Sequence, residues 1–344
     1  MLKEYLHQVI AGRHLTRQQA GEAMNIIMSG QATDAQIASF LTALKLKEET
    51  SGEIAGFAES MRRHAEPVAC RQKELIDVVG TGGDCKRTFN VSTTVAFVLA
   101  GAGLAVAKHG NRSVSSLCGS ADVLTALGID VEMPASAAAA AIDQLKVGFL
   151  FAPVYHKSMK YAAKPRKELG FRTVFNILGP LSNPAGATCQ LIGVYEKALI
   201  DKVAGALADL GVERAMVVHS ADGLDELSTA ASNYVAEVRN GQVHSYELNP
   251  RDFGFAAVPS EAYTGGTAGE NAAIVLQILQ GETGPKRDIV LMNAAAALYI
   301  SGRAGNIPDG VALAADSIDS GRALGKLTAL KEFSIEAGRE TLLS

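Results

Sequence analysis

The chain has 344 residues, of which 48% are hydrophobic and 20% are charged, a composition typical of a globular protein with one large and one small domain. The net charge of −4 argues against a general nucleic-acid-binding protein, which normally carries a basic excess. The four cysteines form no CxxC pair, so a zinc site and a disulfide framework are poor interpretations. Because no leader-like N-terminus and no long apolar run is present, we expect a cytoplasmic protein.

The first 65 residues predict three short helices and no strand. Apolar residues recur with helical spacing over 20–28, 37–44 and 54–61. Each of these runs follows a pair of residues that fits a capping box: Thr16 with Gln19, Thr33 with Gln36, and Thr50 with Glu53. These helices predict a small bundle whose residues are mostly structural.

After Pro67 the pattern alternates between short apolar strands and helices, which predicts a mostly parallel sheet. The expected strands are 75–79, 104–108, 148–152, 191–194 and 214–219, and the expected helices are 91–103, 120–128, 136–145, 200–211, 269–281, 287–302 and 309–321. Two alternating runs over 235–248 flank Asn240-Gly241, which predicts a late antiparallel hairpin. The fold class is therefore α/β, with a small N-terminal helical domain (1–66) and a large α/β domain (67–344).

The segment 155–186 interrupts this alternation, since it is first basic and then rich in Gly, Pro and Asn. We expect part of it, near 158–186, to return to the small domain, with "LGPLSNP" (178–184) as a turn or hinge. The alternative is a long surface connection, although connections of this length without a task are uncommon in compact domains.

A glycine-rich turn, "VVGTGGDCKRTFNVSTT" (78–94), joins the first strand to a helix start rich in hydroxyl groups. Glycines let the backbone approach an anion closely, and a helix N-terminus adds its positive end. The turn matches neither the dinucleotide-binding pattern nor the P-loop. It predicts an anion site, with a purely structural turn as the alternative.

A polar run, "KHGNRSVSS" (108–116), follows the second strand. Lys108 and Arg112 can pair with phosphates, and the serines add hydroxyl groups. Asn111 can both donate to and accept from a less charged ligand. His109 is either a packed structural histidine or a ligand contact, and the sequence leaves both open.

Two further segments carry candidate chemistry. Three carboxylates lie within 222–226 after a strand, and the adjacent Asp225 and Glu226 are hard oxygen ligands of the kind that Mg²⁺ shares with phosphates. The alternative is a solvated loop. In the basic run 156–167, most charges predict a solvated helix face, but an arginine such as Arg166 beside a cleft can hold a carboxylate with two hydrogen bonds.

The motifs "GTGGD", "NVSTT", "KHGNRSVSS", "GSADVL", "RTVFNILGPLSNPA" and "GLDELS" occur in the order and spacing of one family. The chain resembles the anthranilate phosphoribosyltransferases over essentially its full length. The resemblance implies a helical domain joined by a hinge to an α/β domain, and a homodimer formed through the helical domains. It also implies transfer of phosphoribose from phosphoribosyl pyrophosphate to the amine of anthranilate, in tryptophan biosynthesis.

The resemblance also implies roles for individual residues. The phosphoribosyl pyrophosphate site comprises Gly80, Gly83, Asp84, Thr88, Asn90, Val91, Ser92, Thr93, Lys108, His109, Gly110, Asn111, Arg112, Ser113, Val114, Ser115, Ser116 and Ser120. The anthranilate contacts are Gly80, Asn111, His156 and Arg166, and Mg²⁺ falls at Ser92, Asp225 and Glu226. Lys108 and His109 are the candidate catalytic residues. No membrane and no nucleic acid is expected as a partner.

The sequence departs from the family pattern at two places. Leu117-Cys118 stand where a polar pair is more common, and Cys85-Lys86-Arg87 place two cations inside the glycine loop. Neither departure removes a residue that the expected reaction needs. The alternatives are a related nucleoside phosphorylase, whose "KHSTGG"-like stretch is absent, and a non-catalytic homologue that binds nucleic acid.

Overall fold

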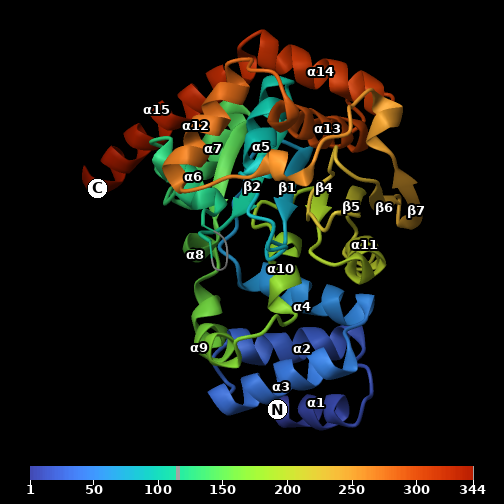
Figure 1. The fold of residues 1–344 in the computed structure, drawn as a ribbon. Helices are drawn as coiled ribbons and strands as arrows, with labels where there is room; N and C mark the ends of the chain where they lie inside the picture. The colour runs from blue at the N-terminus through green and yellow to red at the C-terminus, as the bar shows by residue number, and fades with distance from the viewer. Residues whose placement is uncertain (114–116, 344) are drawn as a thin grey trace.

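The computed structural model describes residues 1–113 and 117–343, which form a helical part at the N-terminus and an α/β part built on one sheet (Figure 1). The helical part begins with α1 (Leu2–Ile10), α2 (Arg17–Met28), α3 (Asp34–Lys47) and α4 (Ser51–His64). The three predicted capping boxes are confirmed at the starts of α2, α3 and α4. The sequence pattern misses α1, because this short helix has no side-chain cap.

The sheet has seven strands in the order β3-β2-β1-β4-β5-β6-β7. The strands are β1 (Leu75–Gly80), β2 (Ala105–Gly110), β3 (Val147–Phe151), β4 (Cys189–Gly193), β5 (Arg214–Ser220), β6 (Asn233–Arg239) and β7 (Gln242–Leu248). β1 to β5 run parallel, and β6 and β7 are antiparallel to their neighbours, as predicted. The hairpin turn is confirmed, since Asn240 and Gly241 have φ values of 51° and 75°, the left-handed backbone of a type I′ turn.

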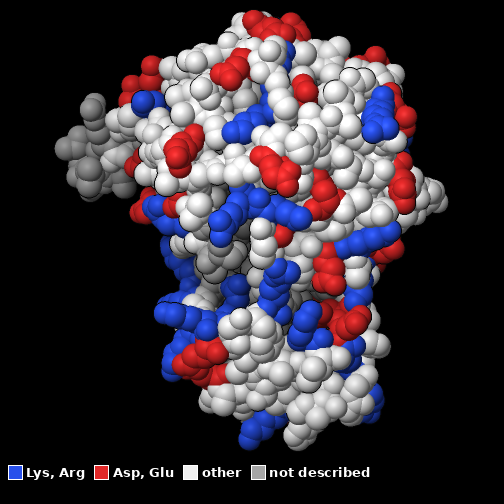
Figure 2. Space-filling model, viewed as in Figure 1, with Lys and Arg blue, Asp and Glu red and all other residues white. Residues whose placement is uncertain are grey.

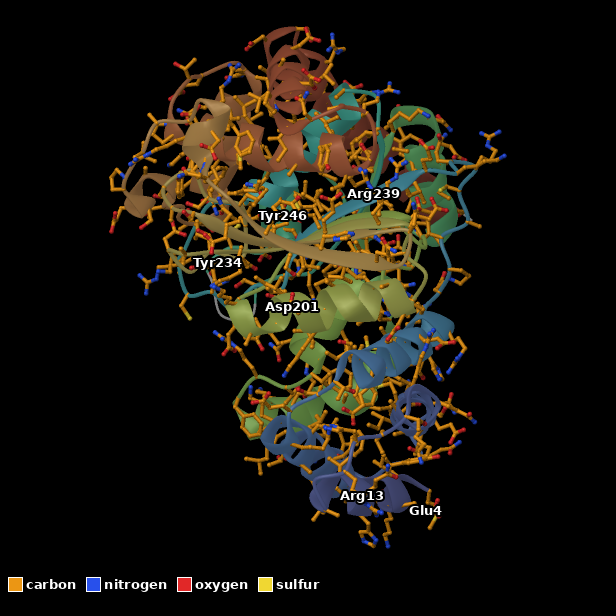
Figure 3. All side chains as sticks on the ribbon, turned by 90° about the vertical axis from the view of Figure 1, so that its right-hand side faces the viewer. Glu4, Arg13, Asp201, Tyr234, Arg239 and Tyr246 are labelled. Carbon is orange, nitrogen blue, oxygen red and sulfur yellow. The ribbon has the colours of Figure 1, made fainter. Side chains whose placement is uncertain are left out.

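Helices cover both faces of the sheet. One face forms the main apolar core with α5 (Val91–Gly101), α6 (Ser120–Ala126), α12 (Ala268–Leu279), α13 (Pro285–Ile300), α14 (Ile307–Asp319) and α15 (Arg322–Leu343). Most buried residues of α7 (Ala135–Leu145) belong instead to a smaller apolar cluster with residues of β1, β2 and β3. On the opposite face α11 (Ile200–Asp209) lies across β5, β6 and β7 and shares its core with the helical part. Figure 3 shows Asp201 on α11 beneath these strands, where its Oδ1 accepts a hydrogen bond of 2.8 Å from Ser245.

The sequence prediction stops one helix short of the observed fold. α15 follows the last predicted helix and buries Ala323, Leu327 and Leu330, which have the i, i+4, i+7 spacing of a helix face. The signal was therefore present in the sequence. None of the described helices combines the length and the apolar character that crossing a bilayer needs.

After β3 the chain runs back to the helical part. The returning elements are α8 (Ala152–Tyr155), α9 (Lys160–Leu169) and α10 (Phe175–Leu181), and α9 packs against α3 and α2. The turn expected over 178–184 is helical as far as Leu181, although Pro180 lies inside it. Short 3₁₀ turns complete the described structure: Lys157–Met159, Lys197–Leu199, Pro250–Phe253 and Ser260–Tyr263.

Candidate functional site

The carboxyl ends of β1 to β5 share one edge of the sheet because these strands are parallel, and open α/β sheets bind their ligands at this edge. The edge faces the helical part, since α8 and α9 connect the end of β3 directly to it (Figure 1). Figure 2 shows lysine and arginine side chains on both sides of the hollow between the two parts. The loops expected to bind phosphates therefore border a basic hollow.

The loop between β1 and α5 has an unusual backbone. Gly82 and Gly83 have φ values of 66° and 79°, and the non-glycine residues Cys85 and Arg87 have values of 61° and 54°. Left-handed residues of this kind turn backbone N–H groups toward a common side and form concavities that bind anions. The strain at Cys85 and Arg87 is typical of ligand-binding loops.

The carboxylates of the loop after β5 close directly on this glycine loop. Asp225 Oδ2 accepts a hydrogen bond from the Gly82 N–H at 2.7 Å, and Glu226 Oε1 accepts one from the Ser92 N–H at 3.2 Å. Asp84 accepts from the Lys86 N–H at 3.1 Å through Oδ1, while its buried Oδ2 has no partner among the described residues. The predicted carboxylate pair and the predicted anion loop thus form a single constellation.

Crowding and burial disfavour the charged forms of these acids. Burial raises the pKa of Asp225 well above its ordinary value, and the neighbouring charges of Asp84 and Glu226 raise it further. Burial also raises the pKa of Glu226 to about 7, against the opposing effect of Lys108. Across residues 1–113 and 117–343 no group of three or more His, Cys, Asp or Glu is arranged to hold a metal ion. The two carboxylates could therefore hold a divalent cation only together with other ligands.

Lys108 is oriented inward rather than toward open solvent. Its side chain is buried, and Nζ donates to the Val78 carbonyl at 2.7 Å and to Ser92 Oγ at 3.2 Å. Burial lowers the pKa of Lys108, while Asp77 and Glu226 raise it in part. Lys108 therefore joins the end of β1 to the first turn of α5, beside the carboxylates.

The other residues expected on the first motif differ in their accessibility. Asn90 lies at the start of α5 and donates through Nδ2 to the Cys118 carbonyl at 3.3 Å, which links the two loops that are expected to bind phosphates. Val91 and Thr93 are buried, and Thr93 lines a small internal cavity beside Lys108. Thr88 is half-buried and forms an isolated bridge with Thr264.

The second polar loop is held by side chains from the first turn of α6. Asn111 and Arg112 are exposed, and Arg112 Nη1 donates to Asp122 Oδ1 at 3.0 Å. Ser120 Oγ donates to the Asn111 carbonyl at 3.2 Å, in the space that a β-carbon on Gly110 would occupy. The Ser113 N–H donates to Asp122 Oδ2 at 3.0 Å. The expected contacts Val114, Ser115 and Ser116 lie outside the described residues.

His109 and His156 form a buried pair at the strand ends, with ring centroids 5.0 Å apart. His109 Nδ1 lies 3.1 Å from the Gly179 carbonyl, so Nδ1 is the protonated nitrogen, and the backbone of Ser182 lies beside the His156 ring and partly offsets the effect of burial on its pKa. The Nε2 atom of each ring is buried without a partner among the described residues. Burial lowers the pKa of His109 to about 3 and that of His156 to about 4, so both imidazoles are neutral at pH 7.

Arg166 differs from its basic neighbours on α9. Its half-buried guanidinium lies 5.0 Å from the centre of the Phe175 ring, and no hydrogen bond or ion pair joins its side chain to any described residue. Lys164, in contrast, is exposed and paired with Asp34 at 2.7 Å. Arg166 therefore has the free donors that a carboxylate clamp needs.

Sequence reasoning missed two residues that contact the site. Arg172 donates from Nη2 to the Gly83 carbonyl and lies 4.2 Å from the centre of the Tyr195 ring, so it ties the segment before α10 to the glycine loop. Asp77 is wholly buried inside β1. Its signal was a carboxylate within the apolar run "LIDVV".

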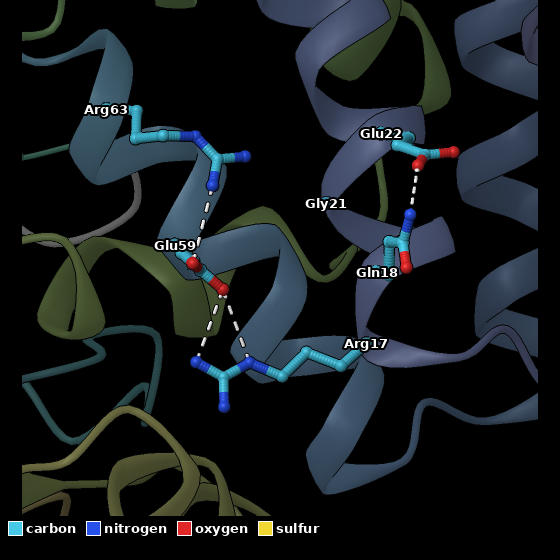
Figure 4. A pocket seen from close by; sticks show the side chains of 6 residues that line it. All are labelled: Arg17, Gln18, Gly21, Glu22, Glu59 and Arg63. Carbon is cyan, nitrogen blue, oxygen red and sulfur yellow. Dashed lines mark hydrogen bonds and ion pairs between the residues drawn. The ribbon is translucent and has the colours of Figure 1, made fainter.

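A separate depression of about 560 Å³ lies between α2 and α4 of the helical part (Figure 4). Arg17 and Arg63 both pair with Glu59, and Gln18 donates to Glu22 at 2.9 Å. Because its charged groups already satisfy one another, this depression is a poor candidate for a ligand site.

Comparison with known proteins identifies relatives over almost the whole chain. Residues 3–65 match the helical bundle domain of the glycosyl transferase family, and residues 72–324 match its a/b domain. The chain is 54% identical to the anthranilate phosphoribosyltransferase of Moorella thermoacetica, over 96% of this chain and 97% of that protein. The Pelotomaculum thermopropionicum enzyme of the same name is 53% identical, over 97% of each chain.

Solved structures agree with these sequence matches. The crystal structure of anthranilate phosphoribosyltransferase from Thermus thermophilus superposes with a TM-score of 0.92 at 43% identity, covering 96% of this chain and 98% of that one. The Saccharomyces cerevisiae enzyme in complex with PRPP and Mg superposes with a TM-score of 0.89 at 30% identity, covering 97% and 98%. The same yeast enzyme has been solved with 4-fluoroanthranilate, with a TM-score of 0.87, 30% identity and the same coverage.

Proposed function

Because the chain belongs to the anthranilate phosphoribosyltransferase family, it is a pentosyl-transferring enzyme, and we propose that the loops at the carboxyl edge of its sheet carry out the transfer. The reaction moves phosphoribose from 5-phosphoribosyl 1-pyrophosphate to the amine of anthranilate, and releases pyrophosphate. The observation that carries the assignment to this edge is the convergence of the glycine loop with Asp225 and Glu226.

The glycine loop and the polar loop after β2 are the proposed site for the sugar phosphate and pyrophosphate. The left-handed backbone around Gly83 supplies N–H groups for an anion, and Arg112 and Ser120 lie on the facing loop. Lys108 adds a positive charge behind Ser92. Together these groups favour departure of a highly charged leaving group.

Mg²⁺ fits the carboxylate side of this site. Asp225 and Glu226 have raised pKa values, and Asp84 Oδ2 has no hydrogen-bond partner among the described residues. A bound cation would offset the repulsion between these crowded carboxylates. Asp225, Glu226 and Ser92 Oγ would hold the ion through oxygen ligands. When bound, Mg²⁺ neutralises charge on the pyrophosphate.

Anthranilate is proposed to bind between α9 and the end of β2. Arg166 has free guanidinium donors for the carboxylate, and Asn111 is exposed on the facing loop. The amine is neutral at pH 7, so the protein need only place it near C1 of the ribose. The bare Nε2 atoms of His109 and His156 offer acceptors to an N–H donor.

We also propose a homodimer formed through the helical parts, in a cytoplasmic protein that does not bind nucleic acid. Exposed Ile10 and Leu46, on α1 and α3, support the dimer. The four cysteines are all free, which suits a reducing compartment. Light scattering after gel filtration gives the mass in solution.

The test of the proposed function is direct. The purified protein is mixed with phosphoribosyl pyrophosphate, Mg²⁺ and anthranilate, and the fall in anthranilate fluorescence is followed. We expect a fall that requires all components and is matched by released pyrophosphate. A stable fluorescence signal with the folded protein would refute the proposal.

A further inference from the structure

Asp77 is a carboxylate in the middle of a central parallel strand, with Ile76 and Val78 on either side. It has no exposed surface. Desolvating a carboxylate is costly unless hydrogen bonds and an opposite charge compensate for it, so a carboxylate at this position calls for an explanation.

Asp77 has three compensating partners. Oδ1 accepts the His109 N–H at 3.1 Å, and Oδ2 accepts from Asn183 Nδ2 at 2.7 Å. The Lys108 ammonium acts on it electrostatically. Burial raises the pKa of Asp77 to about 6, with Lys108 opposing the rise, so the group is charged at neutral pH.

Asn183 extends this contact to a second strand and to the chain after α10. Its Nδ2 also donates to the Ala107 carbonyl at 2.8 Å, and its Oδ1 accepts from the Ala185 N–H at 2.9 Å. One buried amide thus joins β1, β2 and the segment 179–183.

The same segment holds both histidine rings. The Gly179 carbonyl accepts from His109 Nδ1, and the backbone of Ser182 lies beside the His156 ring and raises its pKa against the effect of burial. Two contacts therefore fix His109. Asp77 accepts from its main-chain N–H, and segment 179–183, which Asp77 anchors through Asn183, accepts from its ring. A shift of this segment would turn both Nε2 atoms, which have no hydrogen-bond partner among the described residues.

We propose that Asp77 is a positioning residue for the acceptor half of the site, because its carboxylate holds segment 179–183 against β1 and β2 and thereby orients the imidazoles of His109 and His156. The proposal rests on the proposed function, in which these imidazoles face the aromatic amine. Asp77 itself does not contact substrate. It acts through Asn183 and the main chain of His109.

Other contacts hold the segment in place when this one is lost. Gln190 Nε2 donates to the Pro180 carbonyl at 3.0 Å, and Arg62 Nε donates to the Leu181 carbonyl at 2.7 Å. Variants at Asp77 or Asn183 leave both of these contacts in place and should therefore fold. These substitutions should change the orientation of the two imidazoles and should not prevent folding.

The test compares Asp77→Asn with Asn183→Ala, which breaks the same contact from the other side, together with the hydrogen bonds to Ala107 and Ala185, and keeps the buried charge. We expect each variant to raise the KM for anthranilate at least tenfold, while the Kd for phosphoribosyl pyrophosphate, measured by calorimetry, changes less than threefold. The double variant should be no worse than the worse single variant, because both act through one contact. If Asp77→Asn does not fold, the comparison of Asn183→Ala with the wild-type protein still tests the proposal.

Ser317→Ala is the matched control. Its buried hydroxyl donates to the Val98 carbonyl at 2.7 Å, toward the opposite end of α5, so its loss should lower Tm without changing either KM. An unchanged KM for anthranilate in the variants, or a parallel loss of affinity for both substrates, would overturn the positioning role. Failure of the wild-type protein to consume anthranilate would instead overturn the proposed function.

Discussion

Gly193, the last residue of β4, lies so close to Asp225 that a β-carbon on the glycine would come within 1.5 Å of the Asp225 carbonyl oxygen. Its partner across the sheet is Gly80, where a β-carbon would come within 2.3 Å of Asp225 Oδ2. Two paired strands thus end in residues without side chains, and the carboxylate loop rests directly on their backbones.

Gly193→Ala should displace the carboxylate loop. The added methyl group cannot share space with a main-chain oxygen, so Asp225 must move away from the Gly82 N–H. We expect kcat/KM to fall at least a hundredfold, and overpacking to lower the free energy of unfolding by about 1–3 kcal/mol. Gly52→Ala is the control, since a β-carbon there meets nothing within 4 Å. Steady-state kinetics with near-normal values for Gly193→Ala would show that the loop can shift without loss.

Replacing the crowded acids by neutral isosteres should separate activity from stability. In Asp225→Asn/Glu226→Gln, and in the double alanine variant, turnover at ordinary Mg²⁺ should be lost while the fold remains. Because burial and mutual repulsion raise the pKa values of both acids, the isosteric variant should keep or raise the wild-type Tm. Calorimetric unfolding and the fluorescence assay measure the two properties. Near-wild-type rates would exclude a metal-binding role for the pair.

Lys108→Met should weaken binding of phosphoribosyl pyrophosphate more than binding of anthranilate. The variant keeps most of the apolar stem but removes the charge beside Ser92 and the carboxylates. A buried charge-assisted contact contributes about 1.5–3 kcal/mol, or roughly tenfold to a hundredfold in Kd. A lower Tm should accompany this, since Asp77 and Glu226 lose their buried counter-charge. Unchanged calorimetric affinity for the sugar diphosphate would show that Lys108 is purely structural.

Arg166→Ala should raise the KM for anthranilate and leave that for phosphoribosyl pyrophosphate almost unchanged. If the half-buried guanidinium clamps the carboxylate, the loss in kcat/KM should be about 1.5–3 kcal/mol. Lys164→Ala and Lys167→Ala report general electrostatic attraction, and their effects should be below about 1 kcal/mol and sensitive to salt. If all three substitutions had equally small and salt-sensitive effects on kcat/KM, Arg166 would be a surface charge with no specific contact to anthranilate.

The histidine pair should make the protein sensitive to acid. The pKa of His156 is lowered to about 4 by burial, so between pH 6.5 and 4 the unfolded chain binds more protons than the folded one. The free energy of unfolding should therefore fall as the pH is lowered through this window, by up to about 3 kcal/mol for this group. His109 faces His156, and Lys108 and Asp77 lie behind His109.

Denaturant unfolding of His156→Gln at several pH values measures this slope. The variant should lose part of the acid dependence, whereas the exposed His7→Gln should retain all of it. Identical slopes for the wild type and His156→Gln would mean that His156 is charged in the folded protein.

Much of the fold could be predicted from the sequence because its signals are local. Apolar runs, capping boxes and Asn240-Gly241 act over a few residues, and the strands, most helices and the hairpin are found where these signals lie. The apolar spacing of α15 is equally local. The glycine loop and the Asp225-Glu226 pair could be predicted as neighbours because both follow parallel strands.

The site's buried contacts could not be predicted in this way. Lys108 donates to the Val78 carbonyl, which lies 30 positions earlier in the chain. Asp77 meets Asn183 across 106 positions. Contacts between residues this far apart in the chain are set by packing and not by local pattern. The protonated nitrogen of His109 is likewise set by a distant contact, the Gly179 carbonyl.

The discontinuous helical part has a consequence for synthesis on the ribosome. α1 to α4 are made first, yet their core also contains Ala162 of α9 and Phe175 and Leu178 of α10, roughly 100 residues further along the chain. At about 5–20 residues per second, the early helices wait roughly 5–20 s for these partners. During that interval an apolar surface on the nascent chain is open to chaperones.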